Sequence, residues 1–590
     1  MIGQGIDAGF AGCECGRSDL RAFPPVSVAR GTGAFGLWDA LAALLVLGVL
    51  FLLAEFGREL AEPAPEPTPL PLDPLLLPGL ALRTTLRMLA ALALSLLFTF
   101  TYATWAAKSR RAERILLPLL DILQSVPILG FLSVATTAFL ALAPGRALGA
   151  ELAAIFAIFT SQAWNMAFSF YQSLRTVPAE LDEVARSFRL TGWMRFWRLE
   201  VPFAMPALVW NMMMSMSGGW FFVVAAEAIT VGETTVVLPG IGSWIARAIE
   251  ERDLGAVGWA LATMAVVIFL YDRLLFRPLV AWAERFRFEQ EAGTPLDRSL
   301  VLEALRRSRL VALATAPLAR AWRAGYRLSA RLARPAAGDR NDPLVWLDRA
   351  GVLVLVLFGA YAAGTALETV AAFEPGELLR AAAAGCLTLL RVVVLLVLAS
   401  LLWVPVGVWL GLRPELARIA RPIAQMLAAF PANLLFPLFV SAIVAWRLDP
   451  DVWLAPLMIL GTQWYVLFNV IAGAAAIPRE LRDVATNLRV GGWLWWRKIA
   501  LPAIVPYYLT GAITASGGAW NASIVAELAS WGGERLEARG LGAYIARATE
   551  DGDFARIVLG VAVMSAFVVS INRLFWRPLY RWAEARFRLG

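Results

Sequence analysis

The sequence predicts an all-α, polytopic membrane protein with about twelve transmembrane helices in two parallel repeats of six. Of its 590 residues, 59% are hydrophobic and the mean hydropathy is +0.65, above the roughly 45–50% apolar usage of soluble domains. Charged residues make up 17%, and they separate apolar runs close to the ~20 residues that cross a bilayer. An internal repeat supplies the third observation.

The repeat is read directly from the two halves. Residues 240–253 read GIGSWIARAIEERD and residues 540–553 read GLGAYIARATEDGD, with eight of 14 positions identical at an offset of 300. Earlier in each half the offset is 304, so Arg87 corresponds to Arg391 and Pro127 to Pro431. An even number of helices gives both copies the same orientation. The expected segments are an N-terminal tail 1–36, a first repeat 37–276, a basic linker 277–345 and a second repeat 346–590.

Apolar runs place six helices in each copy. In the first we expect helices near 37–56, 84–107, 115–142, 151–171, 204–226 and 256–276. In the second we expect them near 346–366, 378–408, 422–446, 454–474, 503–526 and 554–574. The linker contains a helical stretch near 299–332, which is either an amphipathic segment on anionic headgroups or a solvated spacer.

The arginines predict the topology. Four basic residues lie in 108–114 and five arginines in 175–198, and short loops rich in Lys and Arg stay in the cytoplasm. Both termini and the linker are then cytoplasmic, whereas the proline-rich and acidic segment 57–80 is outside.

Several functions are disfavoured by composition. The net charge of +8 is better explained by cytoplasmic loops than by nucleic-acid binding. With no histidine and three cysteines, no metal site is expected. The two lysines, Lys108 and Lys498, do not follow a glycine, so no P-loop is present. We therefore expect neither an enzyme nor a cofactor in this chain.

A polar, aromatic-rich loop follows the fourth helix of each copy. It reads PAELDEVARSFRLTGWMRFWRLEVP from Pro178 and PRELRDVATNLRVGGWLWWRKIALP from Pro478. The sequence of each loop predicts two short helices. The second is expected to end before Pro202 or Pro502, where the next span begins.

These loops resemble the "EAA" loop of permease subunits of ATP-binding-cassette importers, with Glu183-Val184-Ala185 and Asp483-Val484-Ala485 each 19 residues before a proline. The Ala-Glu pairs at 226–227 and 526–527 are similar to those of nitrate, sulfonate, taurine and bicarbonate permeases. Two departures stand out. Asp483 replaces the glutamate, and arginine stands at 189 and 489 where the family has glycine, so we expect the turn to have moved to Gly192 and Gly492.

The resemblance implies a fold like that of type I importer permeases and a role as the membrane component for a small solute, expected to be an anion. It implies two copies of a cytoplasmic ATPase that uses ATP and magnesium, a periplasmic or lipid-anchored solute-binding protein, and a bacterial inner membrane. Trp193, Phe196, Trp493 and Trp496 would insert into the ATPase, or alternatively lie at the membrane interface. The candidate coupling residues are Glu183, Ala185, Arg189, Gly192, Trp193, Phe196, Pro202, Asp483, Ala485, Arg489, Gly492, Trp493, Trp496 and Pro502.

Polar groups within spans are candidates for the translocation path, because burying them in lipid is costly. Arg87 and Arg391 could attract an anion or could snorkel to headgroups. Glu227 and Glu527 are expected to have a structural or gating role, pairing with Arg247 and Arg547. The full candidate set is Arg87, Gln162, Trp164, Asn165, Trp220, Glu227, Arg391, Gln463, Trp464, Trp520 and Glu527.

The alternative is a secondary transporter driven by an ion gradient. Such a protein needs an acidic residue within a span, and Asp121 is the candidate. Its counterpart in the second copy is Gln425, so this feature is not repeated.

Overall fold

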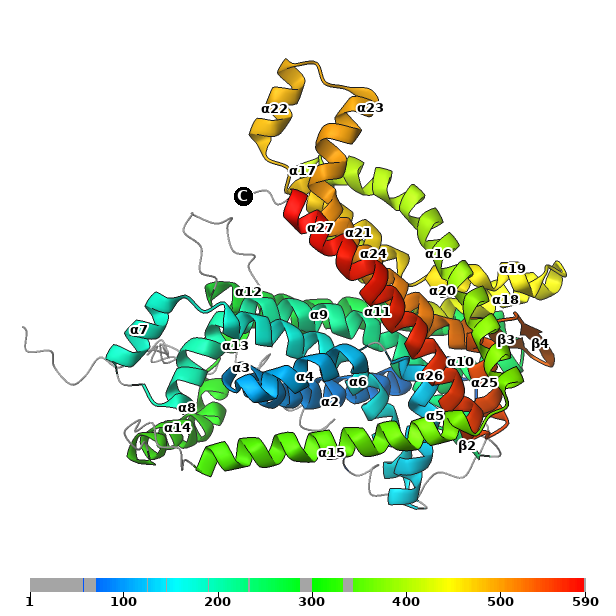
Figure 1. Ribbon diagram of the computed structural model, residues 1–590, viewed down its shortest axis with the longest axis horizontal. Helices are drawn as coiled ribbons and strands as arrows, with labels where there is room; N and C mark the ends of the chain where they lie inside the picture. The colour runs from blue at the N-terminus through cyan, green and yellow to red at the C-terminus, as the bar shows by residue number, and fades with distance from the viewer. Residues whose placement is uncertain are drawn as a thin grey trace, which may run out of the picture.

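The computed structural model describes residues 57, 70–124, 126–144, 146–188, 190–231, 234–286, 300–332 and 343–587. Within these residues, eight helices are long and apolar enough to cross a membrane, and the number rises to eleven if each of three bent helix pairs is one span. They correspond to eleven of the twelve expected helices. The twelfth, at 37–56, and the tail 1–36 lie outside the described residues. The predicted all-α duplicated membrane fold is confirmed (Figure 1).

The first copy and the linker run in chain order as η1 Pro74–Leu76, α2 Leu77–Phe98, η2 Thr99–Ala103, α3 Thr104–Lys108, α4 Arg110–Leu123, α5 Ile128–Leu142, α6 Ala147–Arg175, α7 Ala179–Ser187, α8 Gly192–Arg195, η3 Phe196–Glu200, α9 Val201–Ala226, β1 Ala228–Val231, β2 Thr234–Val237, α10 Ile241–Glu250, α11 Leu254–Tyr271, η4 Asp272–Phe276, α12 Arg277–Ala283, η5 Glu284–Phe286, α13 Leu300–Arg307 and α14 Arg309–Leu332.

The second copy repeats this order as α15 Pro343–Ala371, α16 Pro375–Gly411, α17 Pro414–Ala429, η6 Ala432–Leu435, α18 Phe436–Ala445, α19 Pro450–Trp453, α20 Ala455–Ile459, α21 Gln463–Ala475, α22 Arg479–Asn487, α23 Gly492–Trp495, η7 Trp496–Ala500, α24 Leu501–Ala526, β3 Leu528–Trp531, β4 Glu534–Glu537, α25 Leu541–Glu550, α26 Phe554–Ile571, η8 Asn572–Trp576 and α27 Arg577–Phe587.

The third span of each copy differs from the prediction. We expected single helices at 115–142 and 422–446, but the chain bends by 100° between α4 and α5 and by 77° between α17 and α18. Pro127 and Pro431 lie at these bends. Proline cannot donate a backbone hydrogen bond, and it disfavours helical geometry in the residue before it, so an apolar run alone cannot keep the helix straight. The expected helix 454–474 is also bent, by 42° between α20 and α21.

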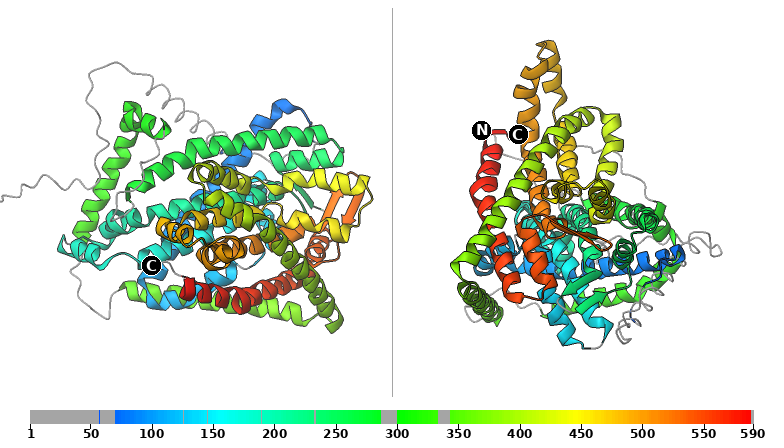
Figure 2. Two further views of the ribbon diagram at one scale, coloured as in Figure 1. Left: turned by 90° about the horizontal axis from the view of Figure 1, so that it is seen from above. Right: turned by 90° about the vertical axis from the view of Figure 1, so that its right-hand side faces the viewer.

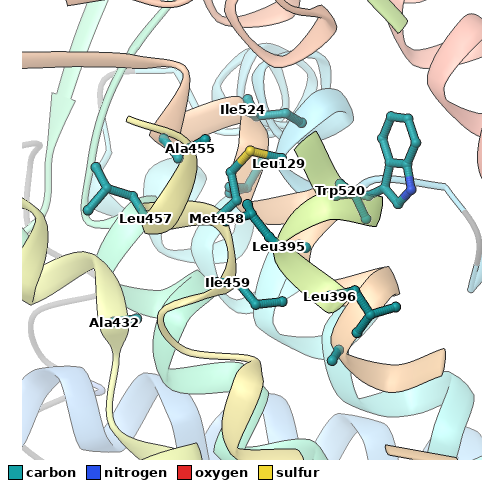
Figure 3. Packing of buried hydrophobic residues seen from close by; sticks show 14 of the residues in the cluster. Leu129, Leu395, Leu396, Ala432, Ala455, Leu457, Met458, Ile459, Trp520 and Ile524 are labelled. Carbon is teal, nitrogen blue, oxygen red and sulfur yellow. The ribbon is translucent and has the colours of Figure 1, made fainter. Parts of the chain in front are cut away.

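The bends let each copy pack into the other. Ile128 and Leu129 of α5 belong to the hydrophobic core of the second copy, and Figure 3 shows Leu129 among side chains of that copy. In return, Leu434 of η6 is fully buried in the core of the first copy. Hydrogen bonds also cross between the copies near the bends. Asn521 of the second copy accepts one from the amide of Ile128 at the first bend, at 2.8 Å. Asn433, which follows the second bend, donates one to the carbonyl of Phe221 in α9 at 3.1 Å.

We expect Asn521→Leu to lower stability by about 1–3 kcal/mol, because the Ile128 amide would be left without a partner between the two copies. Thermal unfolding of the purified chain in detergent measures this loss. Thr514→Leu on the same helix is a matched control, because the Thr514 hydroxyl bonds only within its own helix. An unchanged midpoint for Asn521→Leu would show that the bend is satisfied in another way.

Each copy ends its fifth span in a short antiparallel hairpin, β1–β2 or β3–β4. The polar loop, α7–α8 or α22–α23, lies at the opposite end of that span. Figures 1 and 2 show α22 and α23 projecting from the bundle. The last helix of the first copy continues to Phe286, past the expected boundary at 277, and α12 and α27 are equivalent extensions.

Candidate functional site

Each polar loop has the first of its two predicted short helices, α7 or α22. The second, α8 or α23, does not end before the proline but runs on into the fifth span as one helix, Gly192–Ala226 or Gly492–Ala526. Ala185 and Ala485 are buried and anchor α7 and α22, whereas the neighbouring carboxylates of Glu183 and Asp483 are exposed. Pro202 and Pro502 lie inside these continuous helices, directly after the π-helical turns at 196–200 and 496–500. Each loop therefore exposes an acidic side chain while its alanine packs inward.

The aromatic side chains of the two loops are placed differently from one another. Trp193 and Trp493 are 46% and 74% exposed, so both are available to a partner. Phe196 is only 8% exposed and packs edge-on against Phe100 and Phe170. The expectation that Phe196 inserts into a partner is therefore corrected. A π-helical turn at 196–200 directs this ring into the chain's own core.

The turn of the second loop stays at the family's glycine position although arginine occupies it. Arg489 has φ 50° and the amide of Val490 donates to the Ala485 carbonyl at 2.8 Å, which is a helix end closed by a left-handed residue. Gly492 is also left-handed, with φ 55°. The turn has thus not simply moved to Gly492 as we expected. Arg189 lies outside the described residues, and Gly192 begins α8.

We expect Arg489→Gly to raise stability by about 0.5–1 kcal/mol, since glycine adopts positive φ without the steric cost of a Cβ atom. Arg497→Gly is the control. Arg497 is exposed in a helical turn, where glycine should instead destabilise. The thermal unfolding midpoints of both variants test this contrast, and a lower midpoint for Arg489→Gly would contradict it.

A buried ionic clamp joins three helices of the first copy. Arg87 of α2 is 1% exposed and donates twice to Glu151 of α6 at 2.6 Å and once to Glu227 at 2.7 Å. Glu227 also accepts from the amide of Gly242 at 2.7 Å, in the first turn of α10, where a helix N-terminus favours negative charge. A Cβ atom on Gly240 would stand within 2.4 Å of the Glu227 carboxylate. The clamp fixes the hairpin between Glu227 and Gly240.

The second copy has a looser version of the clamp. Arg391 is 12% exposed and donates to Glu527 at 2.9 Å and to Asp451 at 3.0 Å. Asp451 also pairs with Arg539, while Glu527 accepts from the amide of Gly542 at 2.8 Å. Both arginines are engaged by carboxylates of their own copy.

The expected pairing of Glu227 with Arg247 and of Glu527 with Arg547 is wrong. Arg247 instead pairs with Glu250 and Glu251 on its own helix, and Arg547 pairs with Glu537. Both arginines lie one or two turns beyond the helix N-terminus that the glutamates bind. No feature of the sequence favours Arg87 over Arg247 as the partner of Glu227. Arg87 lies 140 residues before Glu227, and only the fold brings the two side chains together.

A cavity of about 330 Å³ lies between the two copies. Equivalent positions line it from both sides, with Ser161, Asn165 and Gly218 opposite Gly461, Tyr465 and Gly518. The described residues around it include no acid and no base. Its polar groups are hydroxyls, amides and indole N–H groups, and its aromatic lining includes Trp520 and Trp576. The cavity thus offers neutral hydrogen-bond donors beside aromatic faces.

The candidate path residues divide into those that line this cavity and those that do not. Trp164, Asn165 and Trp520 line it. Gln162 is buried against Met88, Trp220 packs against Tyr271, Gln463 accepts a hydrogen bond from Trp403, and Trp464 packs on the same ring. Arg87, Glu227, Arg391 and Glu527 form the clamps. The other lining groups escaped notice because small serines, threonines and glycines carry no distinctive sequence signal.

Asp121 forms an ion pair with Arg577 of the second copy. At the equivalent place in the first copy Arg277 pairs with Asp272 of its own helix, and the second copy has Asn572 there. The acid that an ion-coupled transporter would need is thus engaged by a base of the other copy.

Comparison with known proteins identifies the repeat unit. The family model described as "binding-protein-dependent transport system inner membrane component" matches residues 100–277 and again residues 403–588. A bicarbonate transport system permease protein of Synechococcus elongatus is 29% identical over 185 residues, which are 31% of this chain and 63% of that protein.

Two further relatives show a similar level of likeness. A nitrate import permease protein of Leptolyngbya laminosa is 26% identical over 187 residues, or 32% of this chain and 63% of that protein. A glycine betaine/proline betaine permease protein of Escherichia coli is 26% identical over 194 residues, or 33% of this chain and 51% of that protein. Each match therefore spans less than two thirds of the relative. With its model matched once in each copy, the chain belongs to the family of binding-protein-dependent transport system inner membrane components.

Proposed function

We propose that this chain is the complete pair of permease units of an ATP-binding-cassette importer, in which the solute passes between the two copies. The observation that carries the proposal is the cavity, because equivalent residues of the two copies line it and the bent third spans interlock around it. In this assignment two ATPase subunits dock on the polar loops from the cytoplasm. A solute-binding protein docks at the hairpin end, on the outside of the bacterial inner membrane.

The solute that we propose is a small anion. Hydroxyl, amide and indole groups such as those of Thr462, Asn165 and Trp164 donate hydrogen bonds to an anion without a fixed counter-charge. A site without a strong ion pair can also release its ligand. The bicarbonate and nitrate permeases among the relatives support this choice.

A betaine is the second candidate. Trp164, Tyr465, Trp520 and Trp576 surround the cavity, and aromatic faces attract quaternary ammonium groups. A betaine permease is also among the relatives.

Uptake into membrane vesicles tests the function and the solute together. The chain is co-expressed with an ATP-binding-cassette ATPase and a solute-binding protein from the same organism. Uptake of labelled nitrate, bicarbonate and glycine betaine into right-side-out vesicles is measured with and without ATP loaded inside them. ATP-dependent uptake of an anion supports the first candidate, and ATP-dependent uptake of betaine supports the second. Uptake that is abolished by an ionophore and needs no ATP would favour the ion-driven alternative.

Trp164→Ala separates the two solutes. A cation held by an aromatic face loses about 0.5–2 kcal/mol when one ring is removed, so betaine uptake should weaken severalfold, with a smaller change for an anion. Trp446→Ala is the matched control, because Trp446 is exposed and lies away from the cavity.

A further inference from the structure

The linker between the copies packs on the first polar loop. Trp322 of α14 lies edge-on to Trp197 with ring centroids 4.8 Å apart and touches Trp193 at 6.2 Å. One turn further along α14, Tyr326 is buried, and the guanidinium of Arg198 lies 4.8 Å from the centre of its ring. Trp322 donates to the Tyr326 hydroxyl at 3.0 Å, which holds the two rings in one arrangement. Figure 1 shows α14 beside α8.

The second loop differs in sequence at the places that α14 contacts. Arg497 and Lys498 stand where the first loop has Trp197 and Arg198, and both are exposed. The linker follows α12 of the first copy, whereas the described part of the second copy ends at α27. Trp197 thus occurs in the copy whose loop packs against Trp322 of the linker. Trp193 is correspondingly less exposed than Trp493.

The α8 residues are the first turn of one continuous helix that runs from Gly192 to Ala226. The ends of helices fray unless other contacts hold them. Contacts from α14 therefore contribute to the conformation of residues 192–200. A loop held in its binding conformation loses less conformational freedom when a partner binds.

We propose that linker helix α14 is a brace for the first polar loop, with Trp322 and Tyr326 as positioning residues, so that the two loops offer their ATPases one preorganised and one unbraced docking site. The part of this inference that concerns the ATPase rests on the proposed function. The brace itself is a property of this chain.

Hydrogen–deuterium exchange of the full-length chain in detergent tests the brace without a partner. Trp322→Ala is expected to speed exchange of the amides of residues 192–200 by roughly tenfold, the factor that matches the loss of about two aromatic ring contacts. Exchange of residues 492–500 should not change. Trp322→Phe should restore most of the protection, because it keeps a ring against Trp197. Unchanged exchange at 192–200 in Trp322→Ala would overturn the proposal.

Trp582→Ala is the matched control, because Trp582 is a half-exposed tryptophan of α27 that packs against Phe587. It removes the same side chain from the second copy and should leave exchange at 192–200 unchanged. Equal acceleration by both variants would mean that general loosening, and not the brace, controls the loop.

A titration with the ATPase tests the consequence for docking. Trp322→Ala should weaken ATPase binding at one of the two sites severalfold and leave the other unchanged. Tighter ATPase binding by Trp322→Ala would show that α14 covers the docking surface instead of bracing it. Equal binding at the two sites of the wild-type chain would show that preorganisation of the first loop contributes nothing to docking. Either result overturns the part of the proposal that concerns docking. If the wild-type chain binds no ATPase, the proposed function fails. The hydrogen–deuterium exchange experiment still tests whether α14 stabilises the first polar loop.

Discussion

Replacing Arg87 by leucine is expected to lower the free energy of unfolding by about 3–5 kcal/mol, the cost of removing one partner from a buried ionic cluster. Glu151 and Glu227 would both keep a charge in a buried site without the guanidinium that now neutralises them. Loss of the clamp would also release the hairpin that follows Glu227. Chemical or thermal unfolding of the detergent-solubilised chain measures the effect, provided that membrane insertion is confirmed first.

The second copy supplies the control for this prediction. Arg391→Leu should cost distinctly less, because Asp451 keeps Arg539 and Glu527 keeps the Thr388 hydroxyl and two backbone amides. Arg87→Leu combined with Glu151→Gln and Glu227→Gln should recover part of the loss, since no charge then stays buried. Equal losses from Arg87→Leu and Arg391→Leu would show that burial and alternative partners do not decide the cost.

Trp493→Ala is expected to weaken association with the ATPase by about 2–4 kcal/mol, as removal of a large aromatic from an interface often does. Trp493 is the most exposed aromatic ring of either polar loop, and its loop projects from the bundle (Figure 1). Its indole is therefore available for burial against a partner. Pull-down of the ATPase across a concentration series measures the loss, which corresponds to roughly 30–1,000-fold in Kd.

Two comparisons make the test specific. Trp446→Ala removes an exposed tryptophan of α18 away from the loops and should leave association intact. Phe196→Ala should instead destabilise the chain by about 3–5 kcal/mol, because its ring is part of the core. An unfolding midpoint that is unchanged in Phe196→Ala, together with lost ATPase binding, would show that this ring is a contact residue after all.

The sequence was informative where the signal is local or repeated. The apolar runs predicted the spans, and the repeat predicted two equivalent halves. The polar loops predicted two short helices each, and in the structure the second of these is continuous with the next span. Pro127 and Pro431 can be read from the sequence as well, but the sharp bends that they produce could not be predicted from it. Whether a proline in an apolar run kinks a helix or breaks it depends on which groups can bond the backbone that the break leaves free. At the first bend, Asn521 of the opposite copy accepts the hydrogen bond of the Ile128 amide.

By itself, the sequence determined the class of protein, its duplication and its family, because hydrophobic length, periodicity and a loop motif are properties of neighbouring residues. The tertiary structure alone decided the partners of the charged side chains, the inward position of Phe196 and the cavity between the copies. Arg87 meets Glu151 and Glu227 across 64 and 140 residues, and α14 meets the first loop across more than a hundred. Such contacts depend on how the helices pack. Every arginine in the sequence could form an ion pair with a glutamate, so the sequence alone does not identify the pairs that form.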